Sequence, residues 1–298
     1  MRQGKNGCYE EGSEVTDRVH IGGPNGSVPI AARYNSGLLT PYVHLRSSYD
    51  TDLAIGLIPG ITEDSKFGTV EAQDAADNPV TIWRLADDAR SPRLDKHPFP
   101  TSAFTLYATS SDGSDTAVTL TVDYIDANGY GRTVDVTLTG QTPVQVSATG
   151  DCLNCNRAEN TGGTAAAGDI YLMQGNSVSS GVPSTIGDTV AFIPVNYGQT
   201  QQAAYTVPVG YAIRMKQAVL TISRDSGADG SAEIHVETRK YGKTWIVKRE
   251  WHLQNGVFTK PLAGLVFPAR TSIQMIVQDV SDLDTNVTGE WHYDLVAV

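Results

Sequence analysis

Two cysteines separated by two residues are the pattern in this sequence that could bind a metal or undergo redox chemistry. Cys152 and Cys155 have the spacing of a thiolate pair that can hold Zn²⁺ when two further ligands are present. Cys8, together with His20 or His44, could supply those ligands if the N-terminal segment folds back over the pair. A disulfide and ordinary loop cysteines are the alternatives. We favour ordinary thiols, and we expect no metal and no other cofactor.

A Glu-Trp-His tripeptide occurs twice, at residues 250–252 and 290–292. If the two segments are neighbouring strands of one sheet, the tryptophans could face the core while the Glu and His side chains line the other face. Two acid–His pairs that converge in a cleft could perform acid–base chemistry. Ordinary alternation along two strands explains the same pattern, and it is the interpretation that we favour.

Other motifs of catalysis are incomplete. Residues 241–244 contain the Gly-Lys-Thr of a phosphate-binding loop, but Glu237 stands where its first glycine is required. Residues 282–286 space three oxygen-bearing side chains as a calcium loop does, without the glycine and the bidentate glutamate of an EF-hand. The sequence also lacks a Gly-x-Ser-x-Gly elbow and a His-Glu-x-x-His helix. We therefore expect no catalytic residues and no enzymatic activity.

Composition favours strands over helices. The 298 residues include 29 glycines, with 40% hydrophobic and 18% charged residues, which suits short strands joined by tight turns. The formal charge of -11 disfavours binding to nucleic acid. There is neither an apolar stretch long enough for a membrane span nor the apolar core of a signal peptide, and three cysteines fit a reducing compartment. We expect synthesis in a cytoplasm and no insertion into membranes.

Three regions are predicted along the chain. Residues 1–61 are rich in Gly, Ser, Pro and Asn and are expected to form an extended arm. Residues 62–150 are expected to form a first β domain and residues 151–298 a second one, each a β-sandwich or jelly roll. Short apolar groups in the arm are suited to contacts between subunits: these candidates are Val19, Ile21, Val28, Ile30, Leu38, Leu39, Tyr42, Val43 and Leu45.

Strict alternation of apolar and polar residues predicts individual strands. It runs through 118–124 and 133–138, with Asn128-Gly129 between them as the turn of a hairpin. Residues 140–168 are poor in apolar side chains and contain the glycine-rich stretch 161–168, so they are expected to form an interdomain loop or linker. A change of parity predicts a β-bulge between Met215 and Gln217. In the second domain we predict strands at 169–173, 190–195, 202–207, 211–223, 232–239, 244–253, 272–280 and 290–298.

Several short segments form a further pattern: 168–171 (GDIY), 198–201 (GQTQ), 204–211 (AYTVPVGY) and 266–273 (VFPARTSI), with 66–68 (KFG) and 81–83 (TIW) upstream. In combination they resemble a family of β-rich virion structural proteins of tailed bacteriophages, notably marine ones. The resemblance covers residues 64–298 and not the arm or the cysteine pair. It implies a non-enzymatic virion component that contacts other virion proteins and copies of itself. We favour a neck or tail protein; a capsid decoration (cement) protein and a module that binds a host receptor or glycan are the alternatives.

Overall fold

A computed structural model of the chain describes residues 18–23, 26–35, 38–42, 58–77, 79–87, 90–224, 230–281 and 284–298. Within these ranges the elements are strands, apart from three short 3-10 helices: η1 (Ala75–Asp77), η2 (Arg84–Ala86) and η3 (Ile186–Asp188). The prediction of an all-β protein is confirmed. None of the described helices is long and apolar enough to cross a membrane.

The chain divides into two units, residues 1–58 and 59–298. In the first unit, β1 (Arg18–Gly23), β2 (Gly26–Asn35) and β3 (Leu38–Tyr42) form an antiparallel sheet in that order. Val19 lies opposite Ile30 in the register, and Ile21 lies opposite Val28.

The expectation of an extended arm is therefore wrong for the residues of β1, β2 and β3. Gly23 ends β1 and Gly26 begins β2. Glycine tolerates the backbone conformations of tight connections, so the same residues fit a change of strand direction. Leu38, Leu39 and Tyr42 lie in β3. Cys8, Val43, His44 and Leu45 lie outside the described residues.

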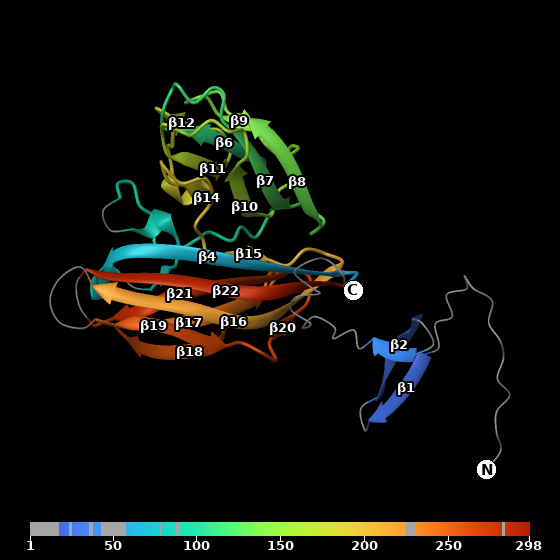
Figure 1. Cartoon of the computed structure of the whole chain (residues 1–298). Helices are drawn as coiled ribbons and strands as arrows, with labels where there is room; N and C mark the ends of the chain where they lie inside the picture. The colour runs from blue at the N-terminus through green and yellow to red at the C-terminus, as the bar shows by residue number, and fades with distance from the viewer. Residues whose placement is uncertain are drawn as a thin grey trace, which may run out of the picture. The chain divides into compact units, whose positions relative to one another are not determined.

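Within the second unit, ten strands form two five-stranded antiparallel sheets that we call the larger body (Figure 1). One sheet has the order β19-β16-β22-β4 with β20 beside β16, and the other has the order β15-β21-β17-β18 with β5 beside β21. Their bounds are β4 (Ile61–Gln73), β5 (Val80–Thr81), β15 (Ala204–Thr206), β16 (Tyr211–Arg224), β17 (Ser231–Lys240), β18 (Ile246–Gln254), β19 (Gly256–Pro261), β20 (Val266–Phe267), β21 (Thr271–Val280) and β22 (Thr285–Ala297).

The two sheets share one hydrophobic core. Side chains alternate between opposite faces of a strand, so every second residue points inward. Along β22 this alternation buries Val287, Trp291 and Tyr293, which pack in one cluster with Leu220 of β16 and Met275 of β21. The bulge predicted in β16 is confirmed, since the register with β22 shifts between Met215 and Gln217.

Eight strands of the larger body pair in a nested order. β4 pairs with β22, β15 with β21, β16 with β19, and β17 with β18. The first strand therefore joins the last, and each later pair lies inside the previous one. The pairs β16–β22 and β17–β21 complete the two sheets.

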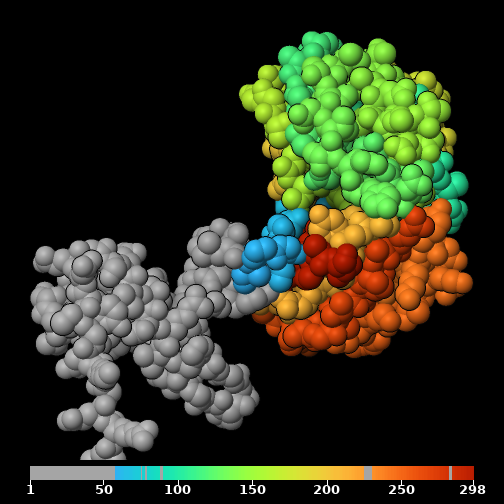
Figure 2. Space-filling model, turned by 90° about the vertical axis from the view of Figure 1, so that its right-hand side faces the viewer, coloured from blue at the N-terminus to red at the C-terminus, as the bar shows by residue number. Residues whose placement is uncertain are grey.

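Residues 104–193 form a second, smaller body that we call the insert, because it lies in the chain between η2 and β15 of the larger body. Figure 2 shows it in green as a lobe against the orange and red larger body. One sheet has the order β10-β7-β8, the other β14-β11-β6-β9, and both contribute to a second hydrophobic cluster. The strands are β6 (Leu106–Ser110), β7 (Thr119–Ile125), β8 (Gly131–Thr137), β9 (Val144–Gln145), β10 (Asn154–Asn160), β11 (Ile170–Gln174) and β14 (Thr189–Ile193), with a short pair β12 (Val178–Ser179) and β13 (Val182–Pro183).

The insert corrects the boundary that we expected at residue 150. β7 pairs with β10, and β6 pairs with β11, so both sheets of the insert contain strands from either side of that position. The larger body also takes strands from both predicted domains, since β4 pairs with β22. The few apolar residues of 140–168 suggested a linker, but the segment lies inside the insert and contains the strands β9 and β10.

The hairpin predicted around Asn128 and Gly129 is confirmed. β7 and β8 pair from Thr119 opposite Thr137 to Ile125 opposite Gly131. Gly129 has a φ of 88°, and its N–H donates to the carbonyl of Asp126 at 2.8 Å. The tip of the hairpin also contacts the larger body, because the Val209 N–H donates to the Gly129 carbonyl at 2.7 Å.

A pair of glycines lies where the chain leaves and re-enters the larger body. Gly68 of β4 is opposite Gly289 of β22. A Cβ atom at Gly68 would overlap the carbonyl oxygen of Ile82 and lie 2.8 Å from the Ala203 nitrogen. Those two backbones are hydrogen-bonded to each other, at 2.9 Å from the Ala203 N–H to the Ile82 carbonyl. The outgoing segment, which contains Ile82 and leads to the insert, and the returning segment, which contains Ala203 and comes back from it, therefore pass β4 at Gly68. A side chain at that position would not fit.

Candidate functional site

The insert and the larger body meet along a buried polar seam between β10 and the strands β4 and β15. A register shift between Cys155 and Arg157 lets Asn156 bulge out of the β7–β10 pairing. Its side-chain amide then bonds the backbone of Thr206, with the Thr206 N–H donating at 2.8 Å and the Asn156 Nδ2 donating to the Thr206 carbonyl at 2.9 Å. One asparagine thus supplies the two hydrogen bonds that a neighbouring strand would make.

Lys66 of β4 is the one buried lysine among the described residues, with 4% of its surface exposed. Its Nζ donates to the backbone carbonyl of Asn156. Burial, followed by the nearby Arg157 guanidinium, lowers the pKa of Lys66 to about 7. A buried amine is disfavoured in its charged form because it loses its hydration.

An ion pair flanks Lys66 in the same seam. Arg157 of β10 donates through Nη2 to Asp64 Oδ1 at 2.8 Å and to the Ser65 carbonyl at 2.8 Å. The Tyr293 hydroxyl donates to the other carboxylate oxygen of Asp64 at 3.0 Å. The cavity beside these groups measures about 160 Å³, below the roughly 300 Å³ of common ligand pockets. The contacts of Arg157 and Lys66 can fasten the two bodies together, and the Tyr293 hydroxyl holds Asp64 in place for them.

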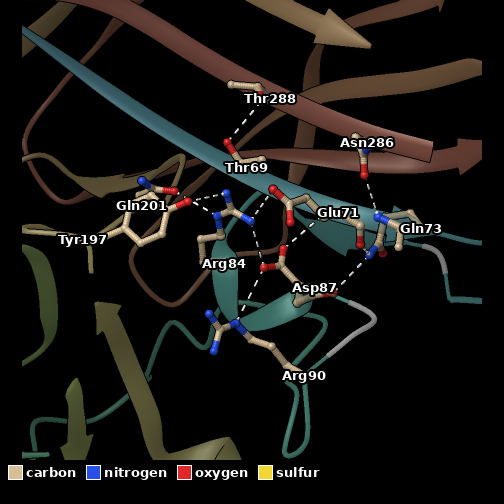
Figure 3. A network of polar contacts seen from close by, with 12 residues as sticks. Thr69, Glu71, Gln73, Arg84, Asp87, Arg90, Tyr197, Gln201, Asn286 and Thr288 are labelled. Atoms are coloured by element: carbon tan, nitrogen blue, oxygen red, sulfur yellow. Dashed lines mark hydrogen bonds and ion pairs between the residues drawn. The ribbon is translucent and has the colours of Figure 1, made fainter. Parts of the chain in front are cut away.

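The two segments that cross β4 are joined by a charged network (Figure 3). Arg84 of η2 contacts Glu71 of β4 at 2.5 Å and Asp87 at 3.2 Å. Its Nε donates to Gln201 Oε1 at 3.0 Å and its Nη2 to the Tyr197 hydroxyl at 3.0 Å, both on the returning segment. Burial raises the pKa of Asp87 to about 6, against the opposing effect of Arg84. One guanidinium therefore ties the outgoing and returning segments to β4.

The cysteine pair lies inside the insert. Cys152 and Cys155 are free thiols and belong to the hydrophobic cluster of that body. Burial raises the pKa of the Cys155 thiol to about 12 and raises the pKa of Cys152 further. Because zinc binds thiolates, such environments oppose the metal site considered for this pair. Cys8 lies outside the described residues, so the full set of proposed ligands stays untested.

The two Glu-Trp-His segments are not neighbours, so the condition for two converging acid–His pairs is not met, and ordinary alternation, the interpretation that we favoured, remains. Residues 250–252 lie in β18 and residues 290–292 in β22, which belong to different sheets. Trp291 is buried, in agreement with the expected orientation. The alternation along each strand was sound, but sequence does not specify which strands become neighbours in a nested order.

The neighbour of the β18 pair is a second Glu-x-His pair on β17, at Glu233 and His235. Glu233 lies opposite His252, and His235 lies opposite Glu250. Sequence analysis missed these residues because it followed the tryptophan repeat. The available signal was the Glu-x-His spacing itself, repeated in two consecutive predicted strands. On the shared outer face of β17 and β18, two imidazoles and two carboxylates converge.

The far edges of the two sheets, β18 and β19 with the adjoining β20, expose large apolar side chains. In Figure 1 β18 lies on the side of the larger body opposite the insert, whereas β4 and β15 face it. The exposed fraction is 55% for Ile246, 70% for Val257 and 59% for Val266. Exposed apolar side chains on edge strands are typical of surfaces that contact other protein chains.

No protein-family model and no curated protein matches the chain. Among solved structures, tripeptidyl peptidase 2 has a TM-score of 0.17 at 10% identity over 80% of this chain, which spans only 20% of the peptidase chain. A structure of the Gt strain of infectious bursal disease virus has a TM-score of 0.11 at 10% identity, covering 85% of this chain and 88% of the viral one. T=1 particles derived from the same virus give 0.11 at 9% identity, with 80% and 78% covered. Similarity at this level shows neither a shared fold nor a shared activity.

Proposed function

We propose that this chain is a non-enzymatic structural subunit of a virus particle, built as a jelly roll that carries an inserted β-sandwich. The nested strand pairing carries this proposal. An eight-stranded double sheet in which strand 1 pairs with 8, 2 with 7, 3 with 6 and 4 with 5 is what results when one long antiparallel ribbon is rolled up. Jelly rolls of this kind form viral capsid domains, lectin domains and cupins.

The resemblance of residues 64–298 to virion proteins of tailed bacteriophages favours the viral member of that set. On this proposal the protein is a neck or tail component that is made in the host cytoplasm and becomes part of the virion. The capsid surface is the alternative location. The negative charge of the chain suits contacts with proteins rather than with packaged nucleic acid.

Contacts with other subunits would use the far edge of the larger body and the apolar residues proposed in the first unit. Ile246, Val257 and Val266 are exposed apolar side chains on β18, the edge strand of one sheet, and on β19 and β20, which pair with β16 in the other sheet. Burying such side chains between subunits supplies the apolar centre that a stable interface needs. The occupant that we propose is a neighbouring copy of this chain or another virion protein.

A glycan- or receptor-binding module is the second candidate, because jelly rolls also form lectins. Exposed tyrosines would be its contact residues. Two of those available are engaged within the chain: the Tyr197 hydroxyl accepts from Arg84, and the Tyr241 hydroxyl donates to the Thr101 carbonyl at 2.6 Å. These internal hydrogen bonds favour the structural role.

The test is to locate the subunit in intact particles by cryo-electron microscopy and to count its copies. We expect a closed ring or a regular surface lattice in which β18–β20 faces a neighbouring chain. Ile246→Asp and Val257→Asp should reduce incorporation into particles, whereas Val298→Asp, at an equally apolar position with 83% exposure outside this edge, should not. Absence of the protein from purified particles, or equal incorporation of all three variants, would contradict the proposal.

A further inference from the structure

Four ionisable side chains converge on the outer face of the sheet at β17 and β18. Residues two apart in a strand point to the same face, so Glu233 and His235 lie on one face of β17, opposite His252 and Glu250 of β18. His235 Nε2 is 2.7 Å from Glu233 Oε1 and 3.7 Å from Glu250 Oε2. His252 Nε2 is 3.1 Å from Glu250 Oε1, and its Nδ1 is 3.7 Å from Glu233 Oε2. Each imidazole therefore contacts both carboxylates.

The cluster is anchored at one end and open at the other. His235 is 8% exposed, so its imidazole is held in place by packing. The His252 side chain is 70% exposed and borders a surface hollow of about 710 Å³ that Glu233 also lines. Solvent and ions can therefore reach the carboxylates without any rearrangement of the sheet.

We propose that this cluster is a binding site for a divalent transition-metal ion of the Zn²⁺ type. One donor atom from each of Glu233, Glu250 and His252 lies within 4.8 Å of the others, which small rotamer changes can close onto one ion. Metal–ligand distances of about 2.0–2.2 Å are usual for imidazole nitrogen and carboxylate oxygen on zinc. Water from the hollow fills the open coordination position.

His235 is a positioning residue in this site. Its Nε2 contacts the carboxylate of Glu233, and carboxylates that bind metals are commonly oriented by such hydrogen-bonding neighbours. The imidazole of His252 favours Zn²⁺, Ni²⁺ or Cu²⁺ over Mg²⁺ and Ca²⁺, which prefer ligand sets made of oxygen alone. The ion would also offset the repulsion between two carboxylates on adjacent strands, and it would link β17 to the edge strand β18.

The chain contains a matched control for the test. Glu290 and His292 of β22 have the same spacing, and their side chains are 3.4 Å apart. Among the described residues, however, three metal-ligating side chains come within reach of one ion on β17 and β18, and not around Glu290 and His292. His292→Gln removes an imidazole from a Glu-x-His strand while leaving the proposed site intact.

The full chain, stripped with a chelator and dialysed, is titrated with ZnCl₂ by isothermal calorimetry and with CoCl₂ by absorbance. We expect one ion per chain, without the thiolate-to-cobalt charge-transfer band that cysteine ligands produce. His252→Gln and Glu250→Gln, both at exposed positions, should each weaken binding by about tenfold or more, and His235→Gln by a similar factor. His292→Gln and MgCl₂ in place of zinc serve as controls, with unchanged zinc affinity and no magnesium binding expected.

Any of three results would overturn the proposal. The first is a wild-type chain that binds neither Zn²⁺ nor Co²⁺ at sub-millimolar concentration. The second is binding that His252→Gln and Glu250→Gln leave unaltered, and the third is a cobalt complex that shows the thiolate band. Circular dichroism of each variant verifies that it is folded, so a loss of affinity is attributable to the ligand that was removed.

Discussion

Lys66 is a residue whose environment in the folded chain differs strongly from water. In the folded chain its pKa is lowered from 10.5 to about 7, mainly by burial. The folded state therefore binds fewer protons than the unfolded state between about pH 7 and 10.5. In that window stability rises with pH. Below it, the folded protein bears the full free-energy cost of burying a charged amine.

Replacing Lys66 by methionine isolates this effect. Wild type should gain stability relative to Lys66→Met as pH rises from 7 to 9, by on the order of 2 kcal/mol for such a shift. Urea unfolding of both proteins at the two pH values measures the difference, and the other titrating groups cancel in the comparison. A difference that is constant with pH would show that Lys66 keeps an ordinary pKa in the folded protein.

Cys152 and Cys155 should be chemically silent in the native protein. The thiolate is the reactive form, and burial raises the pKa of Cys155 to about 12. In a Cys8→Ser background, a thiol reagent such as dithionitrobenzoate should label neither cysteine of the folded chain over minutes, and both at once in denaturant. Fast labelling without denaturant would place the pair in an exposed or mobile segment.

At the scale of single elements, the turn of the β7–β8 hairpin has to adopt a positive φ and also has to fit against the larger body. Gly129 has a φ of 88°, and a Cβ there would lie 2.6 Å from Arg270 Nε and 3.0 Å from Val209 Cγ2. Gly150 has a φ of 68° with nothing within 4 Å of such an atom. Both glycines thus have a positive φ, but of the two, Gly129 is the one that lies against the larger body.

We expect Gly150→Ala to destabilise the chain by about 1 kcal/mol through backbone strain alone. Gly129→Ala should destabilise it further because of the contacts with Arg270 and Val209, and Gly129→Val more still. Denaturant unfolding monitored by circular dichroism gives the three free energies. Equal values for the two alanine variants would mean that the hairpin tip does not press on the larger body.

Strands with clear alternation of apolar and polar residues could be predicted from sequence. A strand whose polar side chains are bonded to residues far away in the sequence could not. β7, β8, β16 and β17 have alternating apolar residues, and the structure has them where the pattern indicated. β10 was taken for part of a linker because Asn154, Asn156 and Arg157 are polar. Their partners, Thr206 for Asn156 and Asp64 for Arg157, lie 50 and 93 residues away in sequence.

The candidate site illustrates the same limit. The Glu-x-His spacing on β17 and β18 is local and visible in the sequence, and their antiparallel pairing follows from a short connection. The order of all eight strands decides which face of the sheet is buried. It also decides that β22, which contains the second Glu-Trp-His segment, lies in the other sheet. No pattern within β18 or β22 distinguishes membership of one sheet from the other.

At the scale of the whole molecule, both hydrophobic clusters consist of residues within the second unit, 59–298. A chain that begins at Pro59 should therefore fold, and its melting temperature should stay within about 2 °C of the full-length value. If the apolar residues of the first unit contact neighbouring subunits, as we propose, this shortened chain should fail to enter particles. Scanning calorimetry and particle purification test the two halves of the expectation.

Two outcomes would contradict it. A melting temperature lower by many degrees would show that residues before 59 belong to the folded core. Normal incorporation of the shortened chain would show that those residues are dispensable for assembly. The Val298→Asp chain provides a full-length comparison for both measurements.

The nested strand order also dictates when the protein can fold during its synthesis. β4 emerges from the ribosome before the insert, yet its partner β22 ends at Ala297, so the larger body cannot close until that residue has been translated. The insert needs only residues 104–193 and can be complete about a hundred residues earlier. Such long sequence separations slow folding, and β4 has to wait unpaired while the insert folds beside it. The nascent chain is thus most exposed to misassociation between the completion of the insert and the emergence of β22, which is the interval in which a chaperone would have most to protect.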